Sequence, residues 1–221
     1  MPWEYILPAG LVRIGAGEPA LEERFEVQWR GDDESPHYFY WVQASALRLE
    51  RLVADAILLL PPRVQVVLEI RQSDEAIDAD PDLPSQIRFA SGVVPREAAL
   101  AVWKEHGPAL VHDGMVGFGA YDPQSSLEVF LDDHKLLSLF APSQEPFDAL
   151  LERHGIPEGE TFPTILDHEH DHVPLVDLPK RAPCVNRALP KRRHHDVAWF
   201  APAIRRALRM RRQRTEPDHG E

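Results

Sequence analysis

Hydrophobic and polar positions alternate with a period of two in several short segments of the chain. Residues 25–29 read Phe-Glu-Val-Gln-Trp, and a second alternation occupies residues 64–70. This alternation is typical of strands with one buried face. The same pattern returns in residues 116–120 and 127–131, and a further apolar segment follows at 136–140, with turn residues between the three segments. The sequence therefore predicts two consecutive antiparallel hairpins in that region.

A longer period, typical of helices, appears between these strands. Residues 38–60 contain neither proline nor glycine, and their apolar positions repeat at helical spacing until Pro61 and Pro62 end the run. A second helix is expected from Pro95 to a stop at residues 106–108, and a short third helix is expected after Pro146. The acidic stretch 73–82 is interpreted as a loop.

The order of these elements predicts the fold class. Strands that are clustered between separated helices, with connections too short for crossovers, favour an α+β fold with a largely antiparallel sheet and two to three helices. We expect an irregular lead-in over 1–20, an acidic α+β domain over 21–157, an extended Pro-rich segment over 158–190, and a basic amphipathic helix with a disordered end over 191–221. A chain of 221 residues is long enough to bury its own core.

Charge is distributed unevenly along the chain. The formal net charge of −12 combines a body, residues 1–179, with 32 acidic against 12 basic residues and a tail, residues 180–221, with 4 against 12. The body therefore carries −20, which attracts cationic partners and repels phosphates. Binding of nucleic acid or of an anionic membrane surface is expected only through the arginines of the tail: Arg205, Arg206, Arg209, Arg211, Arg212 and Arg214.

The number of cysteines and the lengths of the apolar segments indicate the cellular compartment. Cys184 is the single cysteine, so an internal disulfide is excluded. The first residues lack the apolar run of a secretory signal, and no run approaches the roughly 20 apolar residues that span a bilayer. A cytoplasmic protein without a transmembrane segment is therefore expected.

One motif points to metal chemistry. Residues 167–172 read Asp-His-Glu-His-Asp-His, and in an extended chain His168, His170 and His172 would share one face. Three imidazoles suit zinc or another transition metal, so a metal-dependent, hydrolase-like enzyme is one hypothesis, with Glu169 or Asp171 as general base or supporting group. The alternative is a solvated polar loop that holds no metal.

No complete catalytic constellation is present, since neither a phosphate-binding glycine loop nor a serine-hydrolase motif occurs in the chain. The preferred hypothesis is therefore a non-enzymatic interaction protein whose acidic body engages a cationic protein partner. In this hypothesis, exposed carboxylates increase the association rate through long-range attraction. The candidate partner-binding residues are Asp74, Glu75, Asp78, Asp80, Asp82, Asp132 and Asp133.

Overall fold

The computed structural model describes residues 5–14, 20–32, 35–80, 82–178 and 200–213. Its main feature is a nine-stranded sheet with the strand order β11-β5-β4-β7-β8-β9-β3-β2, in which β6 also pairs with β4. All of these pairings are antiparallel. The strands of this sheet are β2 (Arg24–Asp32), β3 (Ser35–Gln43), β4 (Arg63–Arg71), β5 (Gln86–Ala90), β6 (Val94–Pro95), β7 (Val116–Asp122), β8 (Leu127–Leu131), β9 (Leu137–Ala141) and β11 (Arg211–Arg212).

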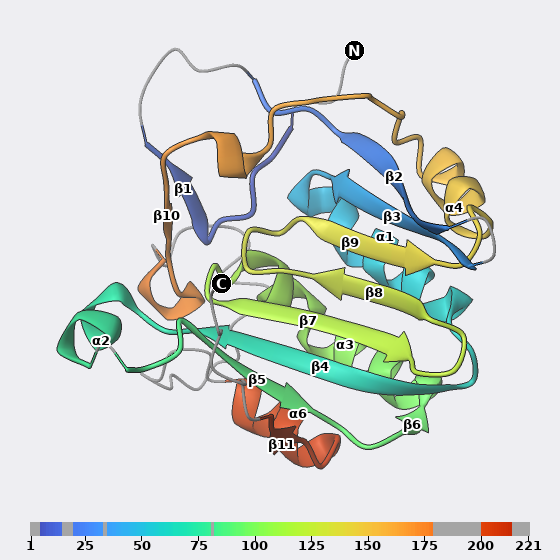
Figure 1. Ribbon diagram of the computed structural model, residues 1–221. Helices are drawn as coiled ribbons and strands as arrows, with labels where there is room; N and C mark the ends of the chain where they lie inside the picture. Colours follow the sequence, from blue (N-terminus) through green and yellow to red (C-terminus); the bar gives the residue numbers. More distant parts are fainter. Residues whose placement is uncertain (1–4, 15–19, 33–34, 81, 179–199, 214–221) are drawn as a thin grey trace.

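Helices cover one face of this sheet. Figure 1 looks onto the opposite face, with α1 and α3 lying behind the strands. The described residues form five α-helices: α1 (Ala46–Leu59), α2 (Asp74–Ala79), α3 (Arg96–His112), α4 (Phe147–Arg153) and α6 (Ala201–Ala207). The predicted α+β class with a largely antiparallel sheet is confirmed. The two predicted hairpins are confirmed as β7–β8 and β8–β9. The described residues contain more helices than the two to three that the sequence predicts.

The first predicted helix begins later than expected. Residues 38–43 belong to β3, and α1 starts only at Ala46. Tyr40 and Val42 are completely buried at alternate positions. Aromatic and β-branched side chains pack well on a pleated surface, so this segment pairs with β2 and β9 instead of extending the helix.

The second predicted helix ends later than expected. α3 continues through Gly107 and Pro108 to His112, because burial of the following turn outweighs the local stop signal. Gly107 lies against the Trp103 ring, where a Cβ atom would be only 3.2 Å from Cε2. The acidic stretch also differs from the expected loop, since the Ser73 side chain accepts a hydrogen bond from the Ala76 amide and caps α2.

The core lies between the sheet and its covering helices. Trp103 on α3 packs against Phe118 of β7, and its indole nitrogen donates to the Glu50 carbonyl of α1 at 2.7 Å, which joins the two helices. The C-terminal part contributes as well, since Phe200 and Ile204 around α6 are fully buried. The Arg205 guanidinium lies 3.9 Å from the centroid of the Phe89 ring, and the arginines of β11 pair with β5. Residues 200–213 of the basic tail therefore pack against the acidic body of the same chain.

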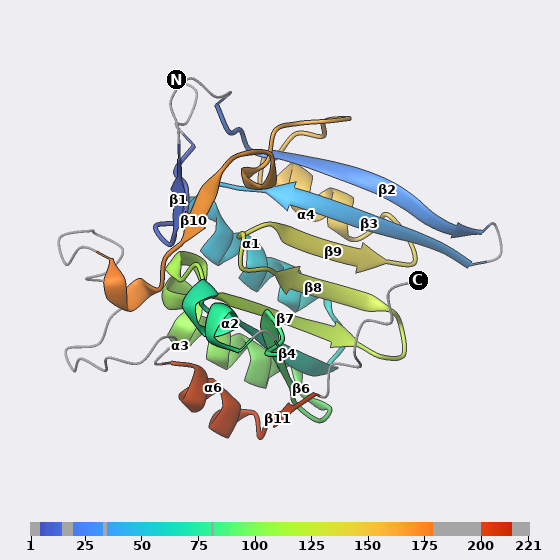
Figure 2. The same ribbon diagram turned by 60° about the vertical axis from the view of Figure 1, so that its left-hand side comes forward.

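A second, two-stranded sheet stands at one end of the main sheet. It pairs β1 (Leu11–Arg13) with β10 (His170–His172) in antiparallel register, with Leu11 opposite His172. Figure 2 shows this pair beside the ends of the main strands. Two short 3-10 turns flank β10, at Ile165–Asp167 and Leu175–Asp177.

Two sequence expectations fall partly outside the described residues. Of the Pro-rich segment expected over 158–190, residues 179–190 are not described, and neither is Arg214 of the basic stretch. In the ranges that the structure does describe, no helix has both the length and the apolar character needed to span a bilayer.

Two leucines of α1 give a matched test of the core. Leu52 is fully buried, whereas Leu47 is 71% exposed. We expect Leu52→Ala to lower the free energy of unfolding by about 2–5 kcal/mol, because it removes buried methyl groups and leaves a cavity. Leu47→Ala should change it by less than about 0.5 kcal/mol. Urea denaturation followed by circular dichroism measures both, and equal effects would contradict this packing.

Candidate metal centre

Three histidines from two distant parts of the chain meet at the end of the main sheet. His134 lies in the turn between β8 and β9, whereas His170 and His172 lie two residues apart on β10 and therefore share one face. One ring nitrogen from each of the three lies within 4.8 Å of the other two. The described residues thus include a histidine cluster that could hold a metal ion.

The distances between the three ring centroids leave room for one ion among the rings. The ring centroids are 5.3 Å apart for His134 and His170, 4.7 Å for His134 and His172, and 5.1 Å for His170 and His172. Three imidazoles that bind one ion tetrahedrally at the usual metal–nitrogen distance of about 2.0–2.1 Å would have centroids about 5.2 Å apart. The three rings therefore already lie close to the separation that an ion would require.

Hydrogen bonds to carbonyl groups fix which ring nitrogen is left for an ion. Nδ1 of His170 is 2.8 Å from the His168 carbonyl oxygen, and Nδ1 of His172 is 2.5 Å from that of Gly114. A carbonyl oxygen only accepts, so each Nδ1 carries the proton and each Nε2 has a free lone pair. Nε2 of His172 is buried and has no hydrogen-bond partner. This is the arrangement in which metal-binding histidines are usually held.

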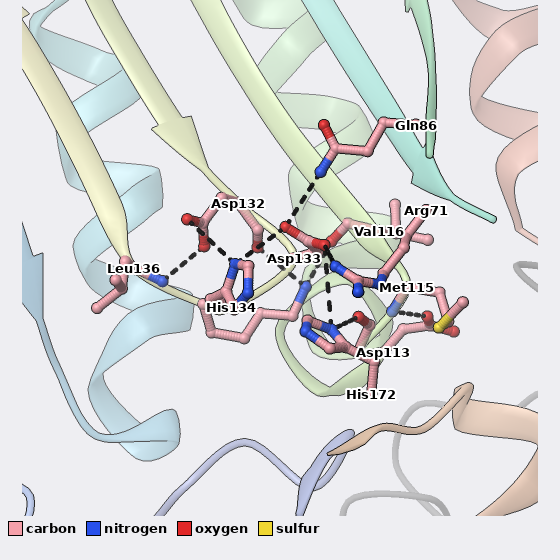
Figure 3. A network of polar contacts seen from close by, with 12 residues as sticks. Arg71, Gln86, Asp113, Met115, Val116, Asp132, Asp133, His134, Leu136 and His172 are labelled. Atoms are coloured by element: carbon pink, nitrogen blue, oxygen red, sulfur yellow. Dashed lines mark hydrogen bonds and ion pairs between the residues drawn. The ribbon is translucent and has the colours of Figure 1, made fainter. Parts of the chain in front are cut away.

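Asp133 supplies the corresponding contact for His134. Its Oδ1 lies 3.3 Å from Nδ1 of His134, while Arg71 at the end of β4 reaches Oδ2 at 3.2 Å and Gln86 at the start of β5 reaches Oδ1 at 3.4 Å (Figure 3). Only 4% of the Asp133 side chain is exposed. Burial acts to raise the pKa of Asp133, but the hydrogen bond and charge of His134 and the hydrogen bond of Arg71 hold it well below its usual value.

Lys135 stabilises the rest of the turn between β8 and β9 through hydrogen bonds of its side chain. This residue adopts a left-handed backbone conformation with φ 61°, and its buried ammonium group donates to the carbonyl oxygens of Val116 and Asp132. Burial lowers the pKa of Lys135 to about 8 and raises that of Asp132 to about 6. The Asp132 carboxylate in turn accepts from the Leu136 amide at 2.9 Å.

The protonation of His172 also suits a ligand. Burial, the largest cause, lowers the pKa of His172 to about 4, so its imidazole is neutral at pH 7. A metal ligand must be neutral to offer its lone pair. An ion that binds at pH 7 therefore does not have to displace a proton from His172.

The structure separates the three histidines of the sequence motif. His170 and His172 lie in the cluster, but His168 precedes β10 at the end of the first 3-10 turn, is 6% exposed, and contributes its backbone carbonyl to His170. Glu169 and Asp171 are exposed at the alternate positions of the strand, away from the face that carries the histidines. A role for either as general base remains a prediction that this placement does not favour.

The carboxylates expected to contact a partner fall into two groups. Glu75, Asp78, Asp80 and Asp82 are exposed on α2 and in the loop after it. Asp132 and Asp133 are instead enclosed beside the histidines, with side chains 21% and 4% exposed. Partner binding thus stays a prediction for the α2 region, whereas the turn carboxylates support the histidine cluster. Asp74 begins α2, and its side chain is not described.

Sequence reasoning did not place His134 in the site. The run Asp132–Lys135 was recognisable as a polar turn between two apolar strands, but nothing local shows that a segment 36 residues later returns to it. The signal that could have found it is a histidine directly preceded by two carboxylates at a hairpin turn.

Comparison of the chain with protein-family models, with curated proteins and with solved structures finds no match.

The glycine beside His172 gives a test of how the site is positioned. A Cβ atom on Gly114 would collide with the carbonyl oxygen of Gly10 and approach the Val173 amide nitrogen to 2.9 Å. We expect Gly114→Ala to lower the free energy of unfolding by more than about 2 kcal/mol, because two backbones must separate.

Gly92→Ala is the matched control, since a Cβ atom there would meet nothing within 4 Å. It should change stability by less than about 0.5 kcal/mol. Thermal and urea unfolding of the two variants would contradict the described backbone contact if Gly114→Ala were as stable as the control.

Proposed function

We propose that the protein is a metal-binding protein whose centre holds one divalent transition-metal ion through Nε2 of His134, His170 and His172. The observation that carries this proposal is the buried Nε2 of His172, which has no hydrogen-bond partner, on a ring whose centroid lies 4.7 Å from that of His134 and 5.1 Å from that of His170. A buried, unpaired nitrogen costs free energy that an ion would recover.

The donor set favours zinc over calcium or magnesium. Calcium and magnesium take oxygen ligands, whereas imidazole nitrogen suits zinc, copper, nickel and iron. Asp132 and Asp133 lie on the Nδ1 side of His134, so they serve to orient the ring and to balance the charge of the ion. Three protein ligands leave the fourth tetrahedral position for a water molecule or another ligand.

Elemental analysis of untagged protein, purified without chelator, tests the proposal directly. We expect about one equivalent of zinc in the natural protein, and binding weakened at least about 100-fold in His134→Gln, because loss of a ligand exceeds the 10–100-fold effect of an outer partner. His168→Gln is the matched control and should retain the metal. Both variants are compared by circular dichroism, so that loss of metal is measured on folded protein.

The result that would overturn the proposal is a natural protein that takes up no zinc, copper, nickel or iron when these are added in excess. Equal metal loss in His134→Gln and His168→Gln, with both variants folded, would overturn the assignment of the ligands.

In this proposal Asp133 orients the His134 ring. An experiment can distinguish this role from a general attraction of the carboxylate for a cation. Asp133→Asn should weaken zinc binding about 10–100-fold, because the amide holds His134 less firmly and balances no charge. Asp78→Asn removes a carboxylate that is exposed on α2 and should leave the dissociation constant within about twofold. Competition against a fluorescent zinc chelator measures both, and equal effects would assign Asp133 only a general electrostatic role.

A further inference from the structure

The face of the main sheet opposite α1 and α3 carries an aromatic hollow that the metal centre does not use. It is lined by Phe39 of β3, Glu128 and Phe130 of β8, and Ser138 and Phe140 of β9, and it has a volume of about 300 Å³. Figure 1 looks onto this face, and no described helix covers it at β3, β8 and β9. The hollow is therefore open to a ligand.

Strand register explains why these side chains gather. Phe39 pairs with Phe140, Phe140 with Glu128, and Phe130 with Ser138, so neighbouring strands point these residues to the same face. Gly119 on β7 lies opposite Phe130, and a Cβ atom there would be 2.5 Å from the Phe130 ring. The glycine thus lets the ring lie close to the sheet and leaves space above it.

Glu128 is the unusual member of this group. Its carboxylate is half-buried beside the phenyl rings, and in the described ranges it accepts no hydrogen bond and forms no ion pair. Arg88, the charge that acts on it, forms its ion pair with Glu69 at 3.4 Å instead. Burial raises the pKa of Glu128. A carboxylate in such a place gains free energy from a ligand that brings positively charged donors.

The chain itself shows that this surface accepts a guanidinium group. Arg30 places its guanidinium carbon 5.2 Å from the centroid of the Phe39 ring, at the margin of the hollow. Aromatic faces attract cations electrostatically, and arginine is the cation found there most often. The same chemistry is available at the Phe130 ring beside Glu128, whereas the His37 imidazole is stacked on the Phe140 ring with the two centroids 5.1 Å apart.

We propose that this hollow binds the guanidinium group of an arginine side chain presented by a basic segment of a partner protein. The Phe130 ring supplies cation–π contact and Glu128 supplies a charge-assisted pair. The net charge of −20 on residues 1–179 favours approach of such a segment. The hollow lies on a broad sheet face that none of the described helices covers at β3, β8 and β9, so a polypeptide can rest on the surface around the inserted side chain.

Two blocked pentapeptides test this proposal on the full-length protein. One has arginine at its centre, and the other has citrulline, the uncharged analogue of nearly equal shape. We expect the arginine peptide to bind about tenfold more tightly, as measured by calorimetry at low ionic strength. Glu128→Gln should abolish this preference.

Glu26→Gln is the matched control, because Glu26 lies on the same face outside the hollow, where it accepts from Gln28 at 2.8 Å. It should retain the preference for arginine, and so should His134→Gln, so a failure of the metal proposal leaves this one unaffected. Equal binding of the two peptides, or an unchanged preference in Glu128→Gln, would overturn the proposal. The proposal would also be overturned if the protein dimerised through this face as its concentration rose and the arginine peptide did not compete with the dimer.

Discussion

The close approach of two glycine backbones holds the two sheets together, and the candidate site depends on it. Val173 donates its amide proton to the Gly10 carbonyl at 2.8 Å, and Gly114 donates to the Val173 carbonyl at 3.1 Å. The buried Asp113 carboxylate extends this junction by accepting from the amide of Leu175 at 3.1 Å. Because Gly114 also accepts from His172, the same contact that docks β10 sets the orientation of a metal ligand.

The main sheet uses its two faces for different purposes. Buried residues such as Val129, Leu139 and Phe118 face α1 and α3, and they make the core that holds the strands in register. The alternate residues point to the other face, where Phe39, Phe130 and Phe140 lie among polar residues such as Glu128 and Ser138. An isolated carboxylate at Glu128 is therefore compatible with a stable fold, since the helical side already provides the burial that stabilises it.

Periodicity predicted the elements whose contacts are local, and it failed where distant packing decides. The hairpins from β7 to β9 follow from alternation and turn residues alone. Residues 38–43 and the turn at Gly107 are ambiguous in isolation, because the sheet neighbours of Tyr40 and the packing of Trp103 determine their conformation. The histidine motif likewise predicted the pair His170 and His172, but period-two reasoning requires one continuous strand, and β10 begins only after His168.

The same limit explains why the third histidine comes from another part of the chain. A strand of three residues presents only two side chains on one face, so β10 alone cannot enclose an ion. The turn at His134 completes the set because Asp133 is anchored to both β4 and β5 and cannot move independently of the sheet. An ion at this place would join β10 to the rigid end of the main sheet, and the free energy of its binding would add to the stability of the folded state.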